Sequence, residues 1–138
     1  MIHYYNASTS NRLLSSGSDN TINYDYDNAG NITRAEPDDN LDKSMNYIYD
    51  SLNRLKEASI GDDPKKAKIL ANYQYNSFSQ RIMKDVQGNK VIFIYNSAGQ
   101  LLEEKNLAQN STTDYIYADG QLIALVQNNI VAYIITDH

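Results

Sequence analysis

The sequence predicts an all-β fold of consecutive antiparallel β-hairpins, and three observations support this prediction. A Tyr-x-Tyr stretch, or a close variant of it, recurs at intervals of 20 to 26 residues. Each copy is followed by turn-forming residues and then by a second run of strand-forming residues. A period of about 22 residues is too short for helical repeats of about 34 residues or propeller blades of about 40–45 residues. We therefore expect about eleven to thirteen short strands and little helix.

The aromatic pairs define the repeat units. Two-residue alternation places both aromatic side chains of a copy on one face of a strand. The second aromatic residues of the five clear copies are Tyr26, Tyr49, Tyr75, Tyr95 and Tyr117. We treat residues 1–138 as a single repeat region, with units near 4–22, 23–45, 46–71, 72–91, 92–113 and 114–132, and a partial unit at 133–138.

The residues after each aromatic pair predict a chain reversal. Asp27 and Asp50 follow the pair in two copies, and Asn76 and Asn96 follow it in the next two. Asp and Asn side chains accept hydrogen bonds from nearby backbone N–H groups, and glycine adopts positive φ readily. A tight hairpin connection is expected at 87–88. The second strands of the units are expected at 31–36, 54–60, 81–86, 100–106 and 121–127.

These units resemble the YD repeat of the RHS protein family, Tyr-x-Tyr-Asp-x-x-Gly-[Arg/Asn]-[Leu/Ile]. The second copy has Asn53 at the glycine position. The third has Ser79 there, with Arg81 and Ile82 assigned to the last two positions. The resemblance covers residues 4 to 138. The copy that matches every defined position consists of Tyr24, Tyr26, Asp27, Gly30, Asn31 and Ile32.

The resemblance implies that the chain is an arc of a large, curved β-sheet that closes into a shell. In bacterial members of the family the shell encloses a toxin or effector, so the implied partners are the rest of the shell and its contents. Animal members display a similar barrel at cell surfaces for adhesion, and YD repeats have been proposed to bind carbohydrate. The implied function is a structural part of an encapsulating shell. The alternative is a carbohydrate-binding or adhesion module, and both functions imply a secreted or cell-surface protein.

The composition argues against several classes of partner. The net charge is -5 and the pI is about 4.8, whereas nucleic acids and anionic membranes attract clustered Lys and Arg. No apolar run approaches the roughly 20 residues of a membrane helix. The first residues lack the basic and apolar regions of a signal peptide. The chain has no cysteine, so we expect neither disulfides nor thiolate metal sites.

We expect no catalytic, cofactor or metal site. The two histidines, His3 and His138, lie at opposite ends of the sequence, and a metal site needs several converging ligands. Asp27 and Asp50 occupy equivalent positions and could form a carboxylate pair, but Asn replaces Asp in the next two copies. Asn can make a turn hydrogen bond but cannot serve as a general acid or base. We therefore assign this position to the turn.

The repeated tyrosines are the candidate binding residues. Their rings could form a platform for sugar rings, with the hydroxyls supplying directional hydrogen bonds. Cross-strand aromatic pairs also stabilise a sheet, by roughly 0.2–1 kcal/mol each, and repetition in every unit favours this structural role. The candidate carbohydrate-binding residues are Tyr24, Tyr26, Tyr47, Tyr49, Tyr73, Tyr75, Tyr95, Tyr115 and Tyr117.

The apolar pattern differs between the two halves of the chain. In the first half, simple alternation places Ile32 and Arg34 on one face, and Thr33 and Ala35 on the other. From residue 90 to residue 135 both faces are apolar, a pattern typical of strands buried on both sides. Each such side chain left in water forgoes roughly 1.5–3 kcal/mol. We therefore expect the isolated chain to self-associate through its C-terminal strands or a sheet edge, unless its two arms cover each other.

Overall fold

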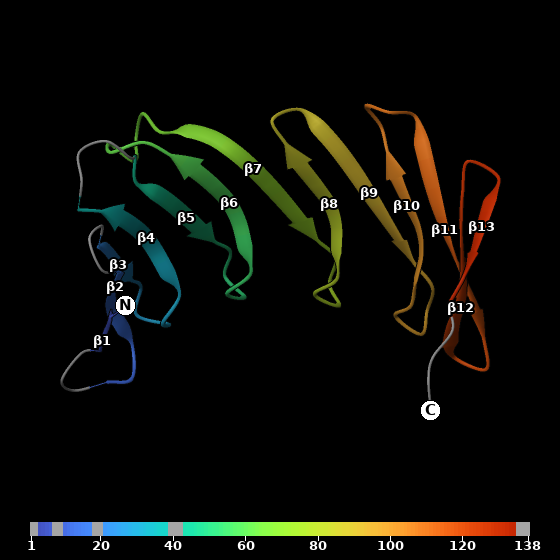
Figure 1. Cartoon of the computed structure of the whole chain (residues 1–138), viewed down its shortest axis with the longest axis horizontal. Helices are drawn as coiled ribbons and strands as arrows, with labels where there is room; N and C mark the ends of the chain where they lie inside the picture. The colour runs from blue at the N-terminus through green and yellow to red at the C-terminus, as the bar shows by residue number, and fades with distance from the viewer. Residues whose placement is uncertain (1–2, 7–9, 18–20, 39–42, 135–138) are drawn as a thin grey trace. The chain divides into compact units, whose positions relative to one another are not determined.

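The computed structural model describes residues 3–6, 10–17, 21–38 and 43–134 (Figure 1). Every regular element in this part of the chain is a β-strand, and the thirteen strands are hydrogen-bonded in chain order. The pairs with a defined register are antiparallel. The predicted all-β fold of antiparallel hairpins is therefore confirmed. The described residues form no helix long and apolar enough to cross a membrane.

The chain forms two compact units, residues 1–72 and residues 73–138. The first contains β1 (His3–Asn6), β2 (Leu13–Gly17), β3 (Ile22–Tyr26), β4 (Ile32–Pro37), β5 (Met45–Tyr49), β6 (Leu55–Ile60) and the start of β7 (Lys68–Tyr75). The second contains the end of β7, then β8 (Arg81–Val86), β9 (Asn89–Tyr95), β10 (Leu101–Asn106), β11 (Ser111–Ala118), β12 (Gln121–Gln127) and β13 (Ile130–Tyr133). The partial repeat expected at 133–138 falls largely outside the described residues.

The predicted second strands agree with β4, β6, β8, β10 and β12 to within one residue at either end. The tight connection expected at 87–88 is also confirmed. Val86 pairs with Asn89 across Gln87 and Gly88. These two residues have φ values of 51° and 90°, the positive values that the favoured two-residue hairpin turn requires at both central positions.

Four other turns share one backbone pattern, which begins at the Asp or Asn after the tyrosine pair. Asp27 donates its N–H to the Asn31 carbonyl at 3.0 Å, and its own carbonyl accepts the N–H of Gly30 at 3.1 Å. Equivalent bonds occur in the turns that begin at Asp50, Asn76 and Asn96. The third residue after the start has positive φ in every case, and these residues are Gly30, Asn53, Ser79 and Gly99. Asn53 and Ser79 therefore do occupy the glycine position, as predicted.

The turn pattern corrects the alignment of the third repeat. The first residue of this turn bonds to the Gln80 carbonyl, so Gln80 holds the motif position after the glycine. Arg81 takes the position of the aliphatic residue, and its guanidinium lies 5.6 Å from the Tyr73 ring centroid and 5.1 Å from that of Phe93. The assignment of Arg81 and Ile82 was therefore wrong by one residue, because an Arg-Ile pair resembles the end of the motif.

A β-bulge recurs beside the second tyrosine of the pair. Tyr26 pairs with Ile32, but Asp25 pairs with Arg34, so Thr33 is an extra residue. Because the bulge interrupts the alternation, Ile32 lies on the tyrosine side of the sheet and Arg34 on the opposite side. The predicted placement of these two residues on one face is therefore wrong. The same shift in register occurs beside Tyr49, Tyr95 and Tyr117.

Neither unit contains a thick hydrophobic core, and the largest fully buried side chain in the described residues is Ser44. In the second unit, one face carries Tyr95 and the opposite face, here called the isoleucine face, carries Ile94 and Ile116. These isoleucines are 45% and 42% exposed. Stability must therefore come largely from strand hydrogen bonds, turns and cross-strand pairs. The buried hydrophobic residues in the described part of the chain are Ala58, Ala71, Phe93 and Ala124.

We expect Gly88→Ala to lower the free energy of unfolding by about 1–2 kcal/mol, because an L-residue is strained in the left-handed region. A Cβ at Gly88 would meet no atom within 4 Å, so the change isolates backbone strain from steric clash. Gly88→Asn is the matched control and should lose less, since Asn tolerates this region better. Urea unfolding measures both variants, and equal stability of Gly88→Ala and the unmodified chain would contradict the turn assignment.

Candidate functional site

The nine candidate tyrosines are half-buried, and some of their hydroxyls bond within the sheet. The Tyr26 hydroxyl donates to the Leu13 carbonyl at 2.7 Å. The Tyr95 hydroxyl donates to the Arg81 carbonyl at 3.1 Å. Each acceptor is the first residue of the preceding strand, β2 or β8. These hydroxyls therefore fasten a strand to its neighbour.

Other tyrosine hydroxyls are also engaged. The Tyr24 hydroxyl lies 2.9 Å from that of Ser16. Burial, and then a hydrogen bond to Glu104, raise the pKa of Tyr115 to about 12. Burial likewise raises the pKa of Tyr49. Carbohydrate binding by the nine tyrosines stays a prediction.

The carboxylates that follow the tyrosine pairs accept hydrogen bonds within their turns. One oxygen of Asp50 accepts the N–H groups of Leu52 and Arg54 at 2.9 and 3.1 Å, and the other accepts the Arg54 guanidinium at 2.8 Å. Burial alone would raise the pKa of Asp50, but these donors outweigh it and hold the pKa below its usual value. The side-chain amide of Asn31 is the main cause of the lowered pKa of Asp27. Both groups are thus favoured as ionised acceptors, which is unsuited to a general acid near neutral pH.

Asparagine performs the same task in the next two turns. Asn76 Oδ1 accepts the N–H groups of Phe78 and Gln80, both at 3.0 Å, while Asn76 Nδ2 donates to Gln80 Oε1 at 2.7 Å. The turn at Asn96 repeats all three bonds. This geometry supports the turn role inferred from the exchange of Asp for Asn.

Three of the residues that lie four positions after the Asp or Asn link neighbouring turns. Asn31 Nδ2 donates to Asn53 Oδ1 at 3.1 Å. These links were not predicted from the sequence, although each of these positions carries a side chain with N–H donors. Similar links of 3.2 and 3.1 Å run from Gln80 Nε2 to the Gly99 carbonyl and from Gln100 Nε2 to the Gly120 carbonyl.

A second polar arrangement crosses the first unit on the face opposite the tyrosines. Asp25, Arg34, Asn46 and Ser59 are directly paired neighbours on β3, β4, β5 and β6. Asn46 and Ser59 are only 6% and 4% exposed. A cavity of about 300 Å³ is lined by this row and by Pro64 of the β6–β7 loop, among others. The row was not predicted from the sequence, because its members are far apart in the chain and share a face only through the strand register.

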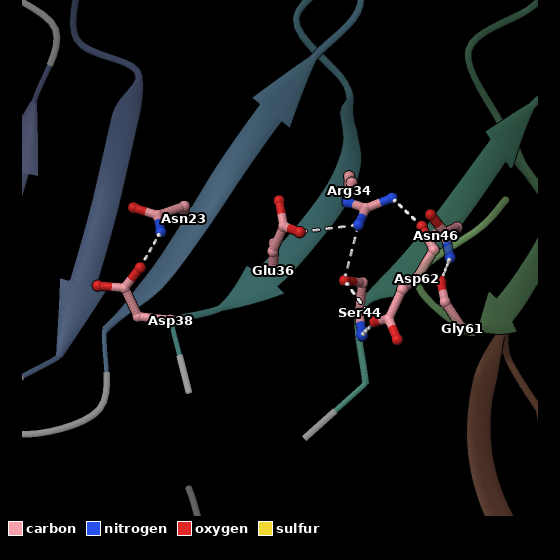
Figure 2. Close-up of polar contacts among 8 residues, drawn as sticks. All are labelled: Asn23, Arg34, Glu36, Asp38, Ser44, Asn46, Gly61 and Asp62. Carbon is pink, nitrogen blue, oxygen red and sulfur yellow. Dashed lines mark hydrogen bonds and ion pairs between the residues drawn. The ribbon is translucent and has the colours of Figure 1, made fainter. Parts of the chain in front are cut away.

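Arg34 lies at the centre of a hydrogen-bond network (Figure 2). Its Nη1 donates to the Asp62 carbonyl at 2.9 Å. Its Nη2 donates to the Ser44 hydroxyl and the Glu36 carboxylate, both at 2.9 Å. Ser44 in turn donates its N–H and hydroxyl to the Asp62 carboxylate at 3.2 and 3.3 Å. The network fastens the loop after β6 to β4 and to the start of β5.

The chemistry open to this network is limited. Ser44 does contact a carboxylate, but it is only 1% exposed, so its hydroxyl is poorly placed to attack a substrate. Among the described residues, the buried Arg34 Nε has no hydrogen-bond partner, so it could donate to one acceptor. Within the described residues, no group of three or more His, Asp or Glu side chains could hold a metal ion. The contacts that Arg34 and Ser44 make with Asp62 hold the loop after β6 in place.

We expect the double variant Asp50→Asn/Arg54→Gln to keep an unfolding midpoint close to that of the unmodified chain at pH 7, because it recreates the Asn76–Gln80 pair. The pKa of Asp50 is lowered in the folded state. Its contribution is therefore present above the unfolded-state pKa near 3.8 and is lost as the pH falls through the folded-state pKa. Urea unfolding from about pH 5 to about pH 2.5 should show a weaker pH dependence in the variant.

The control for this exchange is Asp50→Ala/Arg54→Ala, which removes the side-chain acceptor. This variant should have a clearly lower midpoint at pH 7. If the Asn/Gln variant lost as much stability as the alanine variant, the Asp50 position would need its charge, contrary to the turn role.

The comparison with known proteins rests on structure alone. No family model and no curated protein matches the sequence. The crystal structure of TcdB2-TccC3-Cdc42 matches with a TM-score of 0.68 at 12% identity, over 92% of this chain and 7% of that chain. TcdB2-TccC3 without its hypervariable C-terminal region gives the same values, and TcdB2-TccC3 gives 0.67 at 11% identity, over 92% and 7%.

This chain therefore spans about 7% of the length of the matched chains. At 11–12% identity the match concerns the fold. The matched structures are toxin complexes that contain RHS, or YD-repeat, shells. The chain accordingly has the all-β hairpin fold of a segment of such a shell, the fold that the resemblance in its repeats implied.

Proposed function

We propose that this chain is a structural, non-catalytic segment of a YD-repeat shell that encloses a secreted toxin or effector. The observation that carries this proposal is that the second unit has apolar side chains on both faces of its sheet without a thick core. Phe93 is buried on the tyrosine face, while Ile94, Ile116 and Tyr133 of the isoleucine face are 45%, 42% and 77% exposed. Such a sheet suits a wall whose two sides meet different surroundings.

The exposed isoleucine face is energetically unfavourable in water. Covering a large apolar side chain contributes about 1.5–3 kcal/mol, and a whole domain is stable by only about 5–15 kcal/mol. A few isoleucines left in water are therefore a substantial loss. In the proposed wall, an enclosed polypeptide or a further part of the shell covers them. These are the partners that we propose, and the setting is a secreted protein.

The turns support the same role. Asp27, Asp50, Asn76 and Asn96 use their side-chain oxygens to accept hydrogen bonds within the turns, and further side chains link one turn to the next. Such bonds hold neighbouring hairpins in fixed register. The polar residues that could have suggested catalysis thus contribute rigidity, which a wall requires.

Carbohydrate binding or adhesion is the alternative, and it has less support. A sugar platform would need tyrosine hydroxyls available to a ligand. Those of Tyr26 and Tyr95 donate to backbone carbonyls, and those of Tyr24 and Tyr115 bond to side chains. The rings are only partly exposed. The hydrogen bonds therefore favour the structural role of the stripe.

Cysteine labelling tests the wall. These 138 residues contain no cysteine, and labelling of the unmodified natural protein gives the background from cysteines elsewhere in it. Ile116 is exposed on the isoleucine face. Gln127 is exposed and pairs with Thr113. Because Thr113 is two residues from Tyr115, Thr113 and Gln127 lie on the face that carries the repeated tyrosines. Ile116→Cys and Gln127→Cys would be made one at a time in the natural protein and treated with a bulky polyethylene-glycol maleimide. We expect Ile116→Cys to be protected and Gln127→Cys to react.

Two measurements complete this test. In denaturant both variants should react fully, which shows that both thiols are intact. In the isolated 138-residue chain the ratio of their rates should be closer to one than in the natural protein. Rapid labelling of both positions in the natural protein would overturn the proposal that this sheet separates an inside from an outside.

A further inference from the structure

We propose that the guanidinium of Arg81 binds the carboxylates of an acidic polypeptide segment. The site lies in the second unit, on the face that carries the repeated tyrosines, the tyrosine face. Arg81 begins β8, which lies between β7 and β9 in the sheet order (Figure 1). The inference does not rest on the proposed wall, because it uses only the contacts of one side chain and the charges around it.

Arg81 stands where the other copies of the repeat have an aliphatic residue. Its place follows from its turn, which is closed by the Gln80 carbonyl one residue earlier. In the other four copies, the residue paired with the second tyrosine is Ile32, Leu55, Leu101 or Leu122. The hairpin therefore forms without a charge at this position, and the guanidinium is free to serve another purpose.

Two aromatic rings hold the Arg81 guanidinium in place. Its central carbon lies 5.6 Å from the centroid of the Tyr73 ring and 5.1 Å from that of Phe93. Both distances are within the roughly 6 Å over which an aromatic ring attracts a cation. The rings belong to β7 and β9, the strands on either side of β8. Neither contact is a conventional hydrogen bond, so the five N–H donors of the group stay available.

Those donors have no protein partner in the part of the chain that the structure describes. Arg81 is exposed, and its two ring contacts are its side-chain interactions there. Within β8, β9 and β10, the strand register places one carboxylate on the tyrosine face, that of Glu104. It pairs with Phe93, beyond that ring from Arg81, and it is hydrogen-bonded to Tyr115. The Arg81 donors are thus open to an outside anion.

The local charge also favours an acidic partner. Lys84 pairs with Val91, two residues from Phe93, so it lies on the tyrosine face as well. On β8, β9 and β10 this face therefore has two cations, Arg81 and Lys84, and one carboxylate, although the chain as a whole carries a charge of -5. A small positive patch attracts a short acidic segment. The overall charge repels a long polyanion such as nucleic acid.

The residues around Arg81 resemble those of protein-binding surfaces. Arg and Tyr are enriched among the residues that contribute most to binding between proteins. Tyr75 and Tyr95 are half-buried and carry their rings on the same face as Arg81. The planar guanidinium can bind a carboxylate through two parallel hydrogen bonds. An Asp or Glu side chain of a polypeptide could make these bonds while its neighbours contact the tyrosine rings.

Arginine modification of the natural protein gives the first test. The protein would be treated with a dicarbonyl reagent that modifies arginine, and the modified residues identified by peptide mass spectrometry. We expect Arg81 to be modified faster than Arg54, whose guanidinium is ion-paired with Asp50 at 2.7 Å. An added hexaglutamate peptide should slow the modification of Arg81 at least about threefold. Hexaglutamine should not, and neither peptide should affect Arg54.

Fluorescence anisotropy of labelled hexaglutamate with variants of the natural protein gives the second test. Arg81→Leu removes the guanidinium and introduces the residue that Leu55 and Leu101 supply in other copies, so the fold should be kept. It should weaken binding at least about threefold. Arg81→Lys keeps the charge but not the planar fork, so it should also weaken binding. Lys84→Gln, the control, removes an equal charge from the same strand and face and should have a smaller effect.

Several results would contradict the proposal. If Arg81 resists modification in the folded protein but not in denaturant, its donors are already covered and the site is not open. The proposal is also overturned if hexaglutamate does not bind, or binds Arg81→Leu as tightly as the unmodified protein. If Lys84→Gln weakens binding as much as Arg81→Leu, the peptide responds to positive charge in general, and the specific role of Arg81 is wrong.

Discussion

A side-chain oxygen that accepts backbone N–H groups across a turn sets the geometry of four hairpins in this chain. In each, an Asp or Asn oxygen receives the N–H of the residue four positions later, at 2.9 to 3.1 Å. The bond fixes where the chain reverses, and the reversal fixes which residue faces the second tyrosine. A carboxylate and an amide serve equally well because the bond needs an acceptor and not a charge. The hairpins thereby keep their geometry while this position changes from Asp to Asn.

The β-bulge beside the second tyrosine follows directly after this turn. It inserts one residue after the turn, so side chains on the second strand change faces relative to simple alternation. In the first unit this places Arg34 opposite Asp25 and beside Asn46. The resulting polar row holds the loop after β6 through the contacts of Arg34 with Asp62 and Ser44. A local irregularity in one hairpin thus determines a network that joins segments 28 residues apart.

The sequence predicted the features that depend on near neighbours in the chain. The Tyr-x-Tyr pairs and the Asp or Asn after them were enough to locate the hairpins and the glycine position, including Asn53 and Ser79. Features that depend on register could not be predicted. Thr33 is not recognisable as a bulged residue from its chemistry, so Arg34 was placed on the wrong face. Arg81 resembled the arginine of the motif, and only the bond to the Gln80 carbonyl showed which residue closes the turn.

In a sheet stabilised in this way, polar side chains form their hydrogen bonds locally. Exposed apolar side chains, in contrast, are left without cover. The turns and the links between them satisfy side-chain donors and acceptors without a packed interior. The isoleucine face of the second unit has no such internal solution. Ile116 is on a strand paired on both sides, so it needs cover over the face. The proposed wall supplies this cover from an enclosed polypeptide or a further part of the shell.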